Sequence, residues 1–516
     1  TELQELMFKK LLSLLCFVYG VNAQDSLRYS IDLNRLENDR LRVEVKLPQG
    51  VKEFCFPKMV PGTYAIYNFG RYVSNLQAFD ASGKVISVVR KDTNTFSFKN
   101  ASSLSYEVDD TWDSPEIKGT YIFEPAGTNF QADTLFALNT HALLGYAKGY
   151  EQLPVSLQLK TPPRLIPSSS LIAKDGKYVA SSYQKLTDAP ILVAAADTVH
   201  LHLANTDILI AVYSPSHKIK ASEIATQLKP LLRAQLNYLG GRFPVNNYAF
   251  LLVMSAHLKN GSYGALEHAQ SSFYYLPEDS ISVMGPIIRD VSAHEFFHIQ
   301  TPLNLHSDEI GHFDFQNPQM SKHLWLYEGL TEYAAQHMQL QGGLITLPAF
   351  LERMTEKYRT SNFNFDNSIP FTKMSKGVLS KYKEEYGNVY QKGALIGLCL
   401  DLYLRSETEG RYGTQQLIRD LSARFGPEKS FADQALFDLI LETTQVKGVE
   451  KFLRKYVSGN EELPLASLLA KVGCELRSTD DKKDKIAFLA AMKNELKEMK
   501  NPSPAQLQLR QAWIHH

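Results

Sequence analysis

Cysteine is scarce in this sequence, and its few copies show no pairing pattern. Four cysteines occur among 516 residues, and Cys16 lies in a segment that we expect to be removed. The other three, Cys55, Cys399 and Cys474, lack the paired spacings of a disulfide framework or of a thiolate zinc site, so we expect neither. Cys399 lies in an apolar helical run, where we expect it to be a small buried hydrophobic residue.

Net charge and long apolar runs are also missing. The 55 Lys and Arg residues balance 55 Asp and Glu residues, which argues against a nucleic acid or an anionic membrane as a partner. Beyond the first 23 residues, no segment is long and apolar enough to span a bilayer. We therefore expect no nucleic-acid partner and no stable membrane insertion.

The first 23 residues have the pattern of an export signal. Met7 is followed by Lys9 and Lys10, an apolar run over 11–19 and a small-residue cleavage site that ends at Ala23. An apolar run of about nine residues is too short for a membrane anchor. We expect these residues to be removed, which leaves a mature protein that begins at Gln24 in the periplasm or the medium.

The remaining sequence changes character twice. Residues 24–205 contain short alternating apolar and polar segments between turns, which predicts a β-sandwich-like domain. Residues 206–300 mix a helix near 221–239 with a strand over 248–254 and a further helix, as in an α/β subdomain. Residues 301–476 are predominantly helical, and residues 477–516 form a polar tail with a possible helix over 486–499. The predicted fold class is multidomain α+β.

The most informative stretch is the H-E-F-F-H segment at 294–298. Residues four apart lie on one face of a helix, so His294 and His298 can both direct a nitrogen at one zinc ion. Glu295 is placed to deprotonate a water that the metal activates. Pro286 suits the start of this helix and Pro302 its end. By chance, such a motif would occur in roughly one chain in fifty of this composition, mostly with ordinary core or surface histidines.

The W-L-Y-E-G segment at 325–329 strengthens the metal hypothesis. A catalytic zinc needs a third protein ligand and one open position, and Glu328 is the natural third ligand. A glutamate is seldom placed in an apolar helical run without a partner. The segment therefore argues against a chance H-E-x-x-H match.

Two further segments fit the same chemistry. Tyr390 opens an apolar helical run, where its phenol could donate to the oxyanion of a tetrahedral intermediate, although a tyrosine there more often only packs. Gly264 and Ala265 are small enough for close approach of a peptide backbone. Glu267 follows them and offers a counter-charge to a free amino terminus.

Together these segments resemble the glycyl aminopeptidase family, which comprises gluzincins related to thermolysin and to the mammalian-type alanyl aminopeptidases. The V-P-G-T-Y and F-G-R-Y-V segments at 60–64 and 69–73 are similar to the Pro-Gly-x-Tyr segment of that family's amino-terminal β-domain. The resemblance extends from residue 27 to residue 475. It implies that residues 206–300 form a thermolysin-like α/β subdomain.

The resemblance also implies roles for particular residues. One zinc ion would be held by His294, His298 and Glu328, with Glu295 as general base and Tyr390 as the oxyanion partner. Glu267, with Gly264 and Ala265 on its strand, would bind the substrate amine. Glu332 and Asp401 are candidates to orient the ligands; for both, an ordinary solvated carboxylate is an equally open alternative.

The sequence departs from the family pattern in two places. Many members follow the second histidine with Trp-Asn and basic residues, whereas residues 299–304 read I-Q-T-P-L-N, so the substrate preference stays open. The family commonly ends in a peptide-binding PDZ module, and the forty or so residues after Leu476 are too few for one. We expect that the module is lost or that the chain is truncated.

We therefore interpret the protein as an exported zinc aminopeptidase, with peptides as its partners, that cleaves next to a small free amino-terminal residue by a metal-activated water. A zinc endopeptidase of the same fold is one alternative. A non-catalytic peptide-binding protein that kept the fold is the other. The sequence does not specify the oligomeric state.

Overall fold

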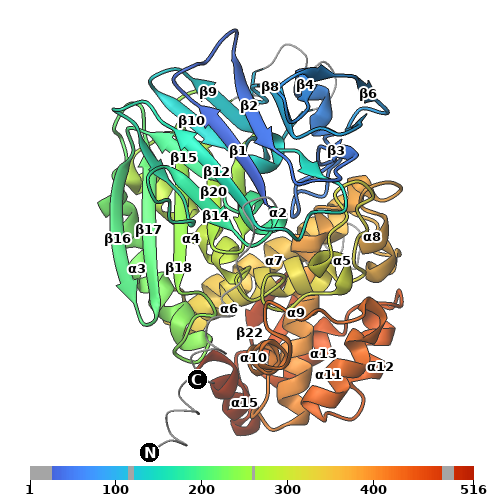
Figure 1. Ribbon diagram of the computed structural model, residues 1–516. Coiled ribbons are helices and arrows are strands. Elements are labelled where there is room, and N and C mark those ends of the chain that lie inside the picture. Colours follow the sequence, from blue (N-terminus) through green and yellow to red (C-terminus); the bar gives the residue numbers. More distant parts are fainter. Residues whose placement is uncertain (1–25, 114–120, 259–261, 479–492, 516) are drawn as a thin grey trace, which may run out of the picture.

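The computed structural model describes residues 26–113, 121–258, 262–478 and 493–515. Strands from the amino-terminal part lie together on one side of the molecule, and helices from the carboxy-terminal part lie on the other (Figure 1). This is the multidomain α+β arrangement that the sequence predicts. The expected export signal over 1–23 lies outside the described residues.

The amino-terminal part contains three sheets among its described residues. Along β2 the side chains alternate, so that Leu41, Val43 and Val45 are buried while Arg42 and Glu44 are exposed. The largest sheet joins seven strands in the order β14 (Lys177–Ala180), β12 (Val155–Lys160), β1 (Leu27–Asp32), β2 (Arg40–Lys46), β8 (Ser103–Asp109), β4 (Val73–Phe79) and β5 (Val85–Ile86). Two four-stranded sheets accompany it: β13 (Ile166–Ser168), β15 (Ile191–Ala194), β10 (Leu135–Leu138), β9 (Thr128–Gln131); and β11 (Tyr146–Ala147), β3 (Glu53–Cys55), β7 (Thr95–Phe98), β6 (Val88–Arg90).

A five-stranded mixed sheet lies between this β-domain and the helices. Its order is β16 (Asp197–Leu203), β17 (Thr206–Tyr213), β18 (Asn247–Ser255), β20 (Ser271–Pro277) and β19 (Gly264–His268). Strand β18 is buried on both faces: Phe250 and Leu252 join the core under two helices, while Leu251 and Val253 join the core under β10 and β15. The sheet begins at residue 197, somewhat before the boundary expected at 206.

Two helices cover one face of this sheet and place the H-E-F-F-H segment. They are α3 (Ala221–Tyr238) and α4 (Ile281–Phe297). The prediction that Pro286 opens the second helix is wrong, because α4 begins five residues earlier, after Ser280. Pro286 is the sixth residue of α4, so its missing N–H removes one hydrogen bond near the start of the helix, and the helix continues past it.

The remaining chain is mostly helical, as expected. Figure 1 shows these helices packed below the sheets. A π-helical segment, η5 (Trp325–Leu330), continues directly into α6 (Thr331–Gln341). This part also contains the α-helices α5 (Asp308–Gly311), α7 (Leu347–Asn364), α8 (Phe371–Gly377), α9 (Asn388–Glu407), α10 (Thr414–Phe425), α11 (Leu436–Thr444), α12 (Val449–Tyr456) and α13 (Leu465–Lys471); the short helix α2 (Tyr183–Thr187) belongs to the amino-terminal part.

The described residues of the segment expected as a polar tail are part of the fold. The helix predicted over 486–499 is wrong where it can be compared, because β22 (Asn494–Glu498) is a strand that pairs with β21 (Cys474–Ser478); residues 479–492 lie outside the described residues. Helix α15 (Pro504–Ile514) follows, and its Trp513 side chain is fully buried. Cys55, Cys399 and Cys474 are buried and free.

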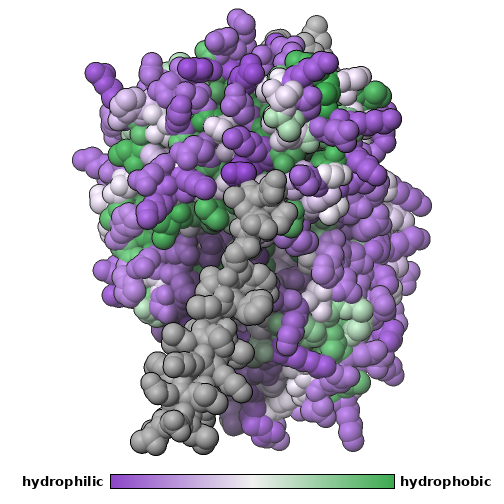
Figure 2. All heavy atoms as spheres, in the orientation of Figure 1, coloured by the Kyte–Doolittle hydropathy of each residue, from purple (hydrophilic) through white to green (hydrophobic). Residues whose placement is uncertain are grey.

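Hydrophilic side chains dominate the face seen in Figure 2, with hydrophobic ones scattered between them. Among the described residues, no helix combines the length and the apolar character that a bilayer crossing needs.

Candidate active site

Two histidines and a glutamate bring three metal-donor atoms together. The Nε2 atoms of His294 and His298 lie 3.1 Å apart, and Glu328 Oε2 lies 3.3 Å from the first and 3.7 Å from the second. Donors of a tetrahedral zinc site, bound at about 2.05 Å, lie about 3.3 Å from one another. The three buried side chains therefore fit one zinc ion in both chemistry and spacing.

The other nitrogen of each histidine is already used. His294 Nδ1 lies 2.8 Å from Glu332 Oε2, and His298 Nδ1 lies 2.8 Å from the carbonyl oxygen of Thr301. Each of these oxygens accepts a hydrogen bond from an Nδ1–H group, which leaves the Nε2 lone pairs directed at the metal position. Glu332 thus lies where the sequence predicts an orienting carboxylate, whereas the carbonyl of Thr301 carries no sequence signal.

A lysine for which the sequence predicts no role holds Glu332 in place. Lys357, on α7, lies 2.8 Å from Glu332 Oε1 and also donates to the backbone carbonyl of Tyr390 at 3.4 Å. Burial alone would raise the pKa of Glu332, but Lys357 and His294 hold it well below its ordinary value. Glu332 is therefore an anion that accepts from His294.

Glu295 is buried next to the ligands and has a free oxygen. Its Oε2 atom has no hydrogen-bond partner within the described structure. Burial raises the pKa of Glu295 to about 7, and the carboxylate of Glu328 adds to the shift while His294 opposes it. A bound cation would oppose it further. An ionised carboxylate with a free oxygen beside the metal donors suits the acceptance of a proton from water.

Tyr390 faces the same site from the first turn of α9. Its ring lies 5.6 Å from the ring of His294, and its hydroxyl lies 2.5 Å from that of Tyr386. Burial raises the pKa of Tyr390 well above the ordinary value, so the phenol stays protonated and can donate. Tyr386 was not singled out by the sequence.

The β-domain closes the site from the opposite side. The Tyr64 hydroxyl donates to Glu328 Oε1 at 2.8 Å, although the two residues are 264 positions apart. Gly62, at φ +87°, lies so close to Glu267 that a Cβ there would meet its Oε1 at 2.4 Å. The sequence marks this loop only through the Pro-Gly-x-Tyr resemblance, without a role for either residue.

The resulting cavity is small, about 220 Å³. It is lined by the proposed ligands and by Glu295, Tyr386, Tyr390, Ala265, Leu266, Glu267, Gly62, Thr63 and Phe123. Gly264 adjoins it, and a Cβ on Gly264 would lie 2.9 Å from Phe123. Burial, with the charges of Glu328 and Glu295, raises the pKa of Glu267 well above its ordinary value.

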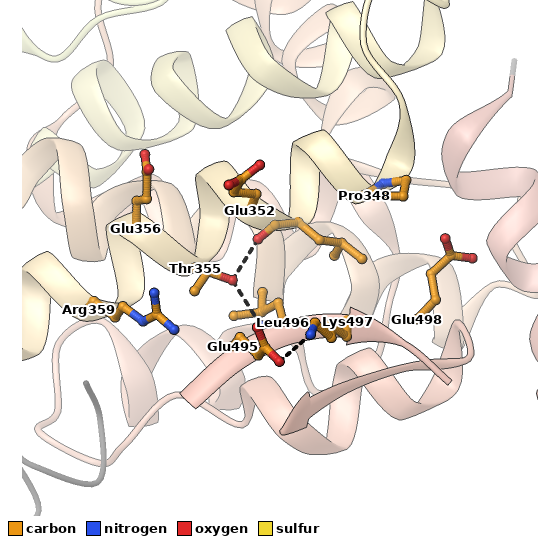
Figure 3. Close-up of a pocket in the computed structure, with 10 residues that line it drawn as sticks. Pro348, Glu352, Thr355, Glu356, Arg359, Glu495, Leu496, Lys497 and Glu498 are labelled. Atoms are coloured by element: carbon orange, nitrogen blue, oxygen red, sulfur yellow. Dashed lines mark hydrogen bonds and ion pairs between the residues drawn. The ribbon is translucent and has the colours of Figure 1, made fainter. Parts of the chain in front are cut away.

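A larger groove, about 490 Å³, lies elsewhere, between α7 and β22 (Figure 3). Its lining residues contact one another: Lys497 forms an ion pair with Glu495, and the Thr355 hydroxyl accepts a hydrogen bond from the backbone N–H of Leu496. None of the proposed ligands lines it. The small cavity, and not the large groove, therefore holds the candidate chemistry.

The helices that carry Glu328 and Tyr390 touch backbone to backbone. Gly329 faces Gly393, and a Cβ on Gly329 would lie 2.5 Å from the Gly393 main chain. Only glycine permits this approach. The contact sets the distance between η5 and α9, and so between the third ligand and the phenol.

Asp401 does not lie where the sequence interpretation put it. Its oxygens accept from Tyr333 at 2.7 Å, from Arg405 at 3.2 Å and from the backbone N–H of Thr414 at 2.7 Å. These contacts belong to a buried network between α6, α9 and α10. The prediction that Asp401 orients a zinc ligand is therefore wrong, because its hydrogen bonds go to Tyr333, Arg405 and Thr414.

Two family models match the chain. A Peptidase M61 N-terminal domain matches residues 28–195, and M61 glycyl aminopeptidase matches residues 288–396. Together they cover more than half of the 516 residues. The fold, the donor cluster and these matches define a zinc metallopeptidase. The chain belongs to the M61 glycyl aminopeptidase family, which confirms the resemblance of its motifs.

Solved structures share the fold at low identity. An aminopeptidase N family protein from Idiomarina loihiensis is 20% identical with a TM-score of 0.77, over 89% of this chain and 82% of that chain. An M1 zinc metallopeptidase from Deinococcus radiodurans is 15% identical with a TM-score of 0.52, over 85% of this chain and 94% of that chain. A mutant of it bound to a Tyr-Ser-Ala substrate has a TM-score of 0.51 at 15% identity, over the same shares. A comparison with curated proteins gives no match.

Proposed function

We propose that the protein is an exported aminopeptidase that uses one zinc ion to remove a small first residue from peptides with a free amino terminus. The observation that carries the proposal is Glu267. Its carboxylate shares the small cavity with the metal donors, and ligand atoms of Glu267, Glu295 and His298 all lie within 4.8 Å of one another. A carboxylate this close to the reacting bond leaves room for one residue between the amine and the metal.

The size of the cavity supports the preference for a small first residue. Gly62 and Phe123 form its walls, and both approach the strand that carries Glu267. The cavity, about 220 Å³, lies beside both Glu267 and the metal donors, where the first residue and its scissile peptide would bind. A glycine or alanine side chain fits such a space without displacing the walls.

The edge of the five-stranded sheet supports recognition of an extended peptide. Among the described strands, β19 pairs with β20 alone, and Ala265, Leu266 and Glu267 line the cavity. An edge strand can add one further strand through main-chain hydrogen bonds. Such pairing would direct the amino terminus of the peptide at Glu267.

Each side chain of the site has a separate role in the proposed reaction. Zinc, when bound, supplies a Lewis acid that polarises the scissile carbonyl and makes water more acidic. Glu295 accepts a proton from the attacking water at its free oxygen and later donates it to the leaving amine. The Tyr390 phenol donates a hydrogen bond to the oxyanion of the tetrahedral intermediate. Glu267 holds the substrate ammonium by an ion pair in a desolvated cavity.

The export part of the proposal rests on the sequence of residues 1–23. If a signal peptidase acts after Ala23, amino-terminal sequencing of the protein from the periplasm or medium will begin at Gln24. Recovery only from the cytosol with Met7 retained would contradict it.

The substrate proposal is tested with the zinc-loaded protein and a peptide library in free and acetylated forms. We expect stepwise release of first residues, fastest for glycine or alanine. Acetylation should slow cleavage by about 10²- to 10³-fold, because a blocked amine carries no charge with which Glu267 can form an ion pair. Glu267→Ala should lower cleavage of free peptides toward the rate for acetylated ones, and Glu295→Gln serves as the blank for contaminating peptidases.

Equal cleavage of free and acetylated peptides would overturn the aminopeptidase assignment and favour the zinc endopeptidase. Absence of any turnover in a zinc-loaded sample would favour the peptide-binding protein instead.

A further inference from the structure

Tyr64 has an unusual backbone conformation for a bulky residue. Its φ is +51°, in the left-handed region that side chains with a Cβ rarely adopt. The residue is half-buried at the tip of a β-domain loop, and its ring packs on Tyr386 with centroids 4.8 Å apart. Backbone strain of this kind persists where the surroundings require one particular placement of a side chain.

The two oxygens of Glu328 have different partners. Oε1 accepts the Tyr64 hydroxyl at 2.8 Å, whereas Oε2 lies 3.3 Å from His294 Nε2 and 3.7 Å from His298 Nε2. Only one oxygen therefore faces the metal position. A carboxylate whose two oxygens were both free could rotate and offer both to one cation.

We propose that Tyr64 is a positioning residue that holds Glu328 Oε1 away from the zinc, so that Glu328 binds through Oε2 alone and one coordination position stays open. The proposal rests on the ligand set of the proposed function. A catalytic zinc site needs that open position. A hydrogen bond to the outer oxygen of a ligating carboxylate fixes its orientation, and partners of this kind strengthen metal binding. The amino-terminal β-domain thereby supplies a part of the metal centre.

The first test measures zinc affinity and not activity. Zinc is removed from the whole protein, and its dissociation constant is measured by competition with a chromophoric chelator. Tyr64→Phe keeps the ring on Tyr386 and removes only the hydroxyl, and we expect zinc to bind about 10- to 100-fold more weakly. Tyr29→Phe is the matched control, because its buried hydroxyl donates to Gly145 within the same domain at 2.7 Å; it should bind zinc as the unmodified protein does.

Unchanged affinity in Tyr64→Phe, or an equal loss in Tyr29→Phe, would overturn the proposal. The second test asks whether the effect passes through Glu328. In a Glu328→Ala background, Tyr64→Phe should cause no further loss of zinc affinity, because the acceptor is gone. The same loss in both backgrounds would show that Tyr64 acts through the fold, and would also overturn the proposal.

Cobalt(II) in place of zinc gives an independent readout of coordination number. If the released carboxylate binds through both oxygens, the visible bands of cobalt-loaded Tyr64→Phe should be weaker than those of the unmodified protein. Identical spectra would contradict the claim about the open position. These measurements use no substrate, so a failure of the aminopeptidase assignment would leave their outcome untouched.

Discussion

Gly62→Ala should separate the amine-binding role of Glu267 from the stability of the β-domain. Gly62 has φ +87°, and an added Cβ would lie 2.4 Å from Glu267 Oε1 and 2.8 Å from its Cδ. The obstructing atoms belong to the end of a flexible side chain and not to the main chain. The fold should therefore survive the substitution, while the carboxylate moves.

The magnitude follows from two separate terms. An alanine in the left-handed region costs about 1–2 kcal/mol of folding free energy. The carboxylate must withdraw by about 1 Å to restore an ordinary contact, and a misplacement of that size can lower a catalytic rate by about 10²-fold. We expect kcat/KM for a free Gly-initiated peptide to fall by about that factor, and the slow cleavage of its acetylated form to stay the same.

Gly83→Ala provides the matched control. Gly83 lies in the same domain at φ +84°, with nothing within 4 Å of an added Cβ, so it carries the backbone cost without the clash. Urea unfolding and peptidase assays on both variants complete the comparison. If Gly62→Ala cleaves free peptides as well as Gly83→Ala does, then Glu267 does not act on the amine in the way we propose.

The other predictions concern the metal and the core. Glu295→Gln should keep near-stoichiometric zinc and lose about 10²- to 10⁴-fold in turnover, because it removes the base but no ligand; substantial remaining hydrolysis would exclude the role. Tyr390→Phe should lower kcat by roughly 10²-fold or more with little change in KM, and an unchanged kcat would leave only packing for this residue. Lys357→Met should weaken zinc binding about 10-fold by releasing Glu332, and chelator competition measures this. Unchanged affinity would show that Lys357 does not support His294 through Glu332. Asp401→Asn should lower the free energy of unfolding by about 3–5 kcal/mol, because it leaves Arg405 buried without its ion-pair partner, while folded protein keeps its zinc affinity; weakened zinc binding would instead restore Asp401 to the metal centre.

Local periodicity predicts the parts of the site that lie on single helices. The spacing of His294 and His298 requires one shared face, and the structure brings their Nε2 atoms to 3.1 Å. The same reasoning relates Glu332 to Glu328 one turn apart. The family resemblance extends this to Tyr390 and Glu267, whose proximity to the metal depends on tertiary packing.

Contacts between distant segments are the parts that the sequence does not reveal. Tyr64 meets Glu328 across 264 positions, and no local pattern encodes such a meeting. Lys357 looks like an ordinary lysine in an amphipathic helix until the fold places it against Glu332. For Asp401, the sequence interpretation assigned a role at the metal site that the fold does not support. Its apolar helical surroundings suit a ligand-orienting carboxylate and a buried ion pair equally well. Trp513 likewise lies in a polar segment of the sequence. Its side chain is buried because the fold places it in a hydrophobic core, which the local sequence does not predict.

The contact of Gly329 with Gly393 has a consequence for protein engineering. Because main chain meets main chain there, the spacing of η5 and α9 cannot be adjusted by trimming or enlarging a side chain. Attempts to broaden the range of accepted first residues should therefore leave these two helices alone, keep Gly62 and Tyr64, and vary Thr63 and Phe123, which also line the cavity. Libraries built on those positions would reshape the pocket while the hydrolytic apparatus keeps its dimensions.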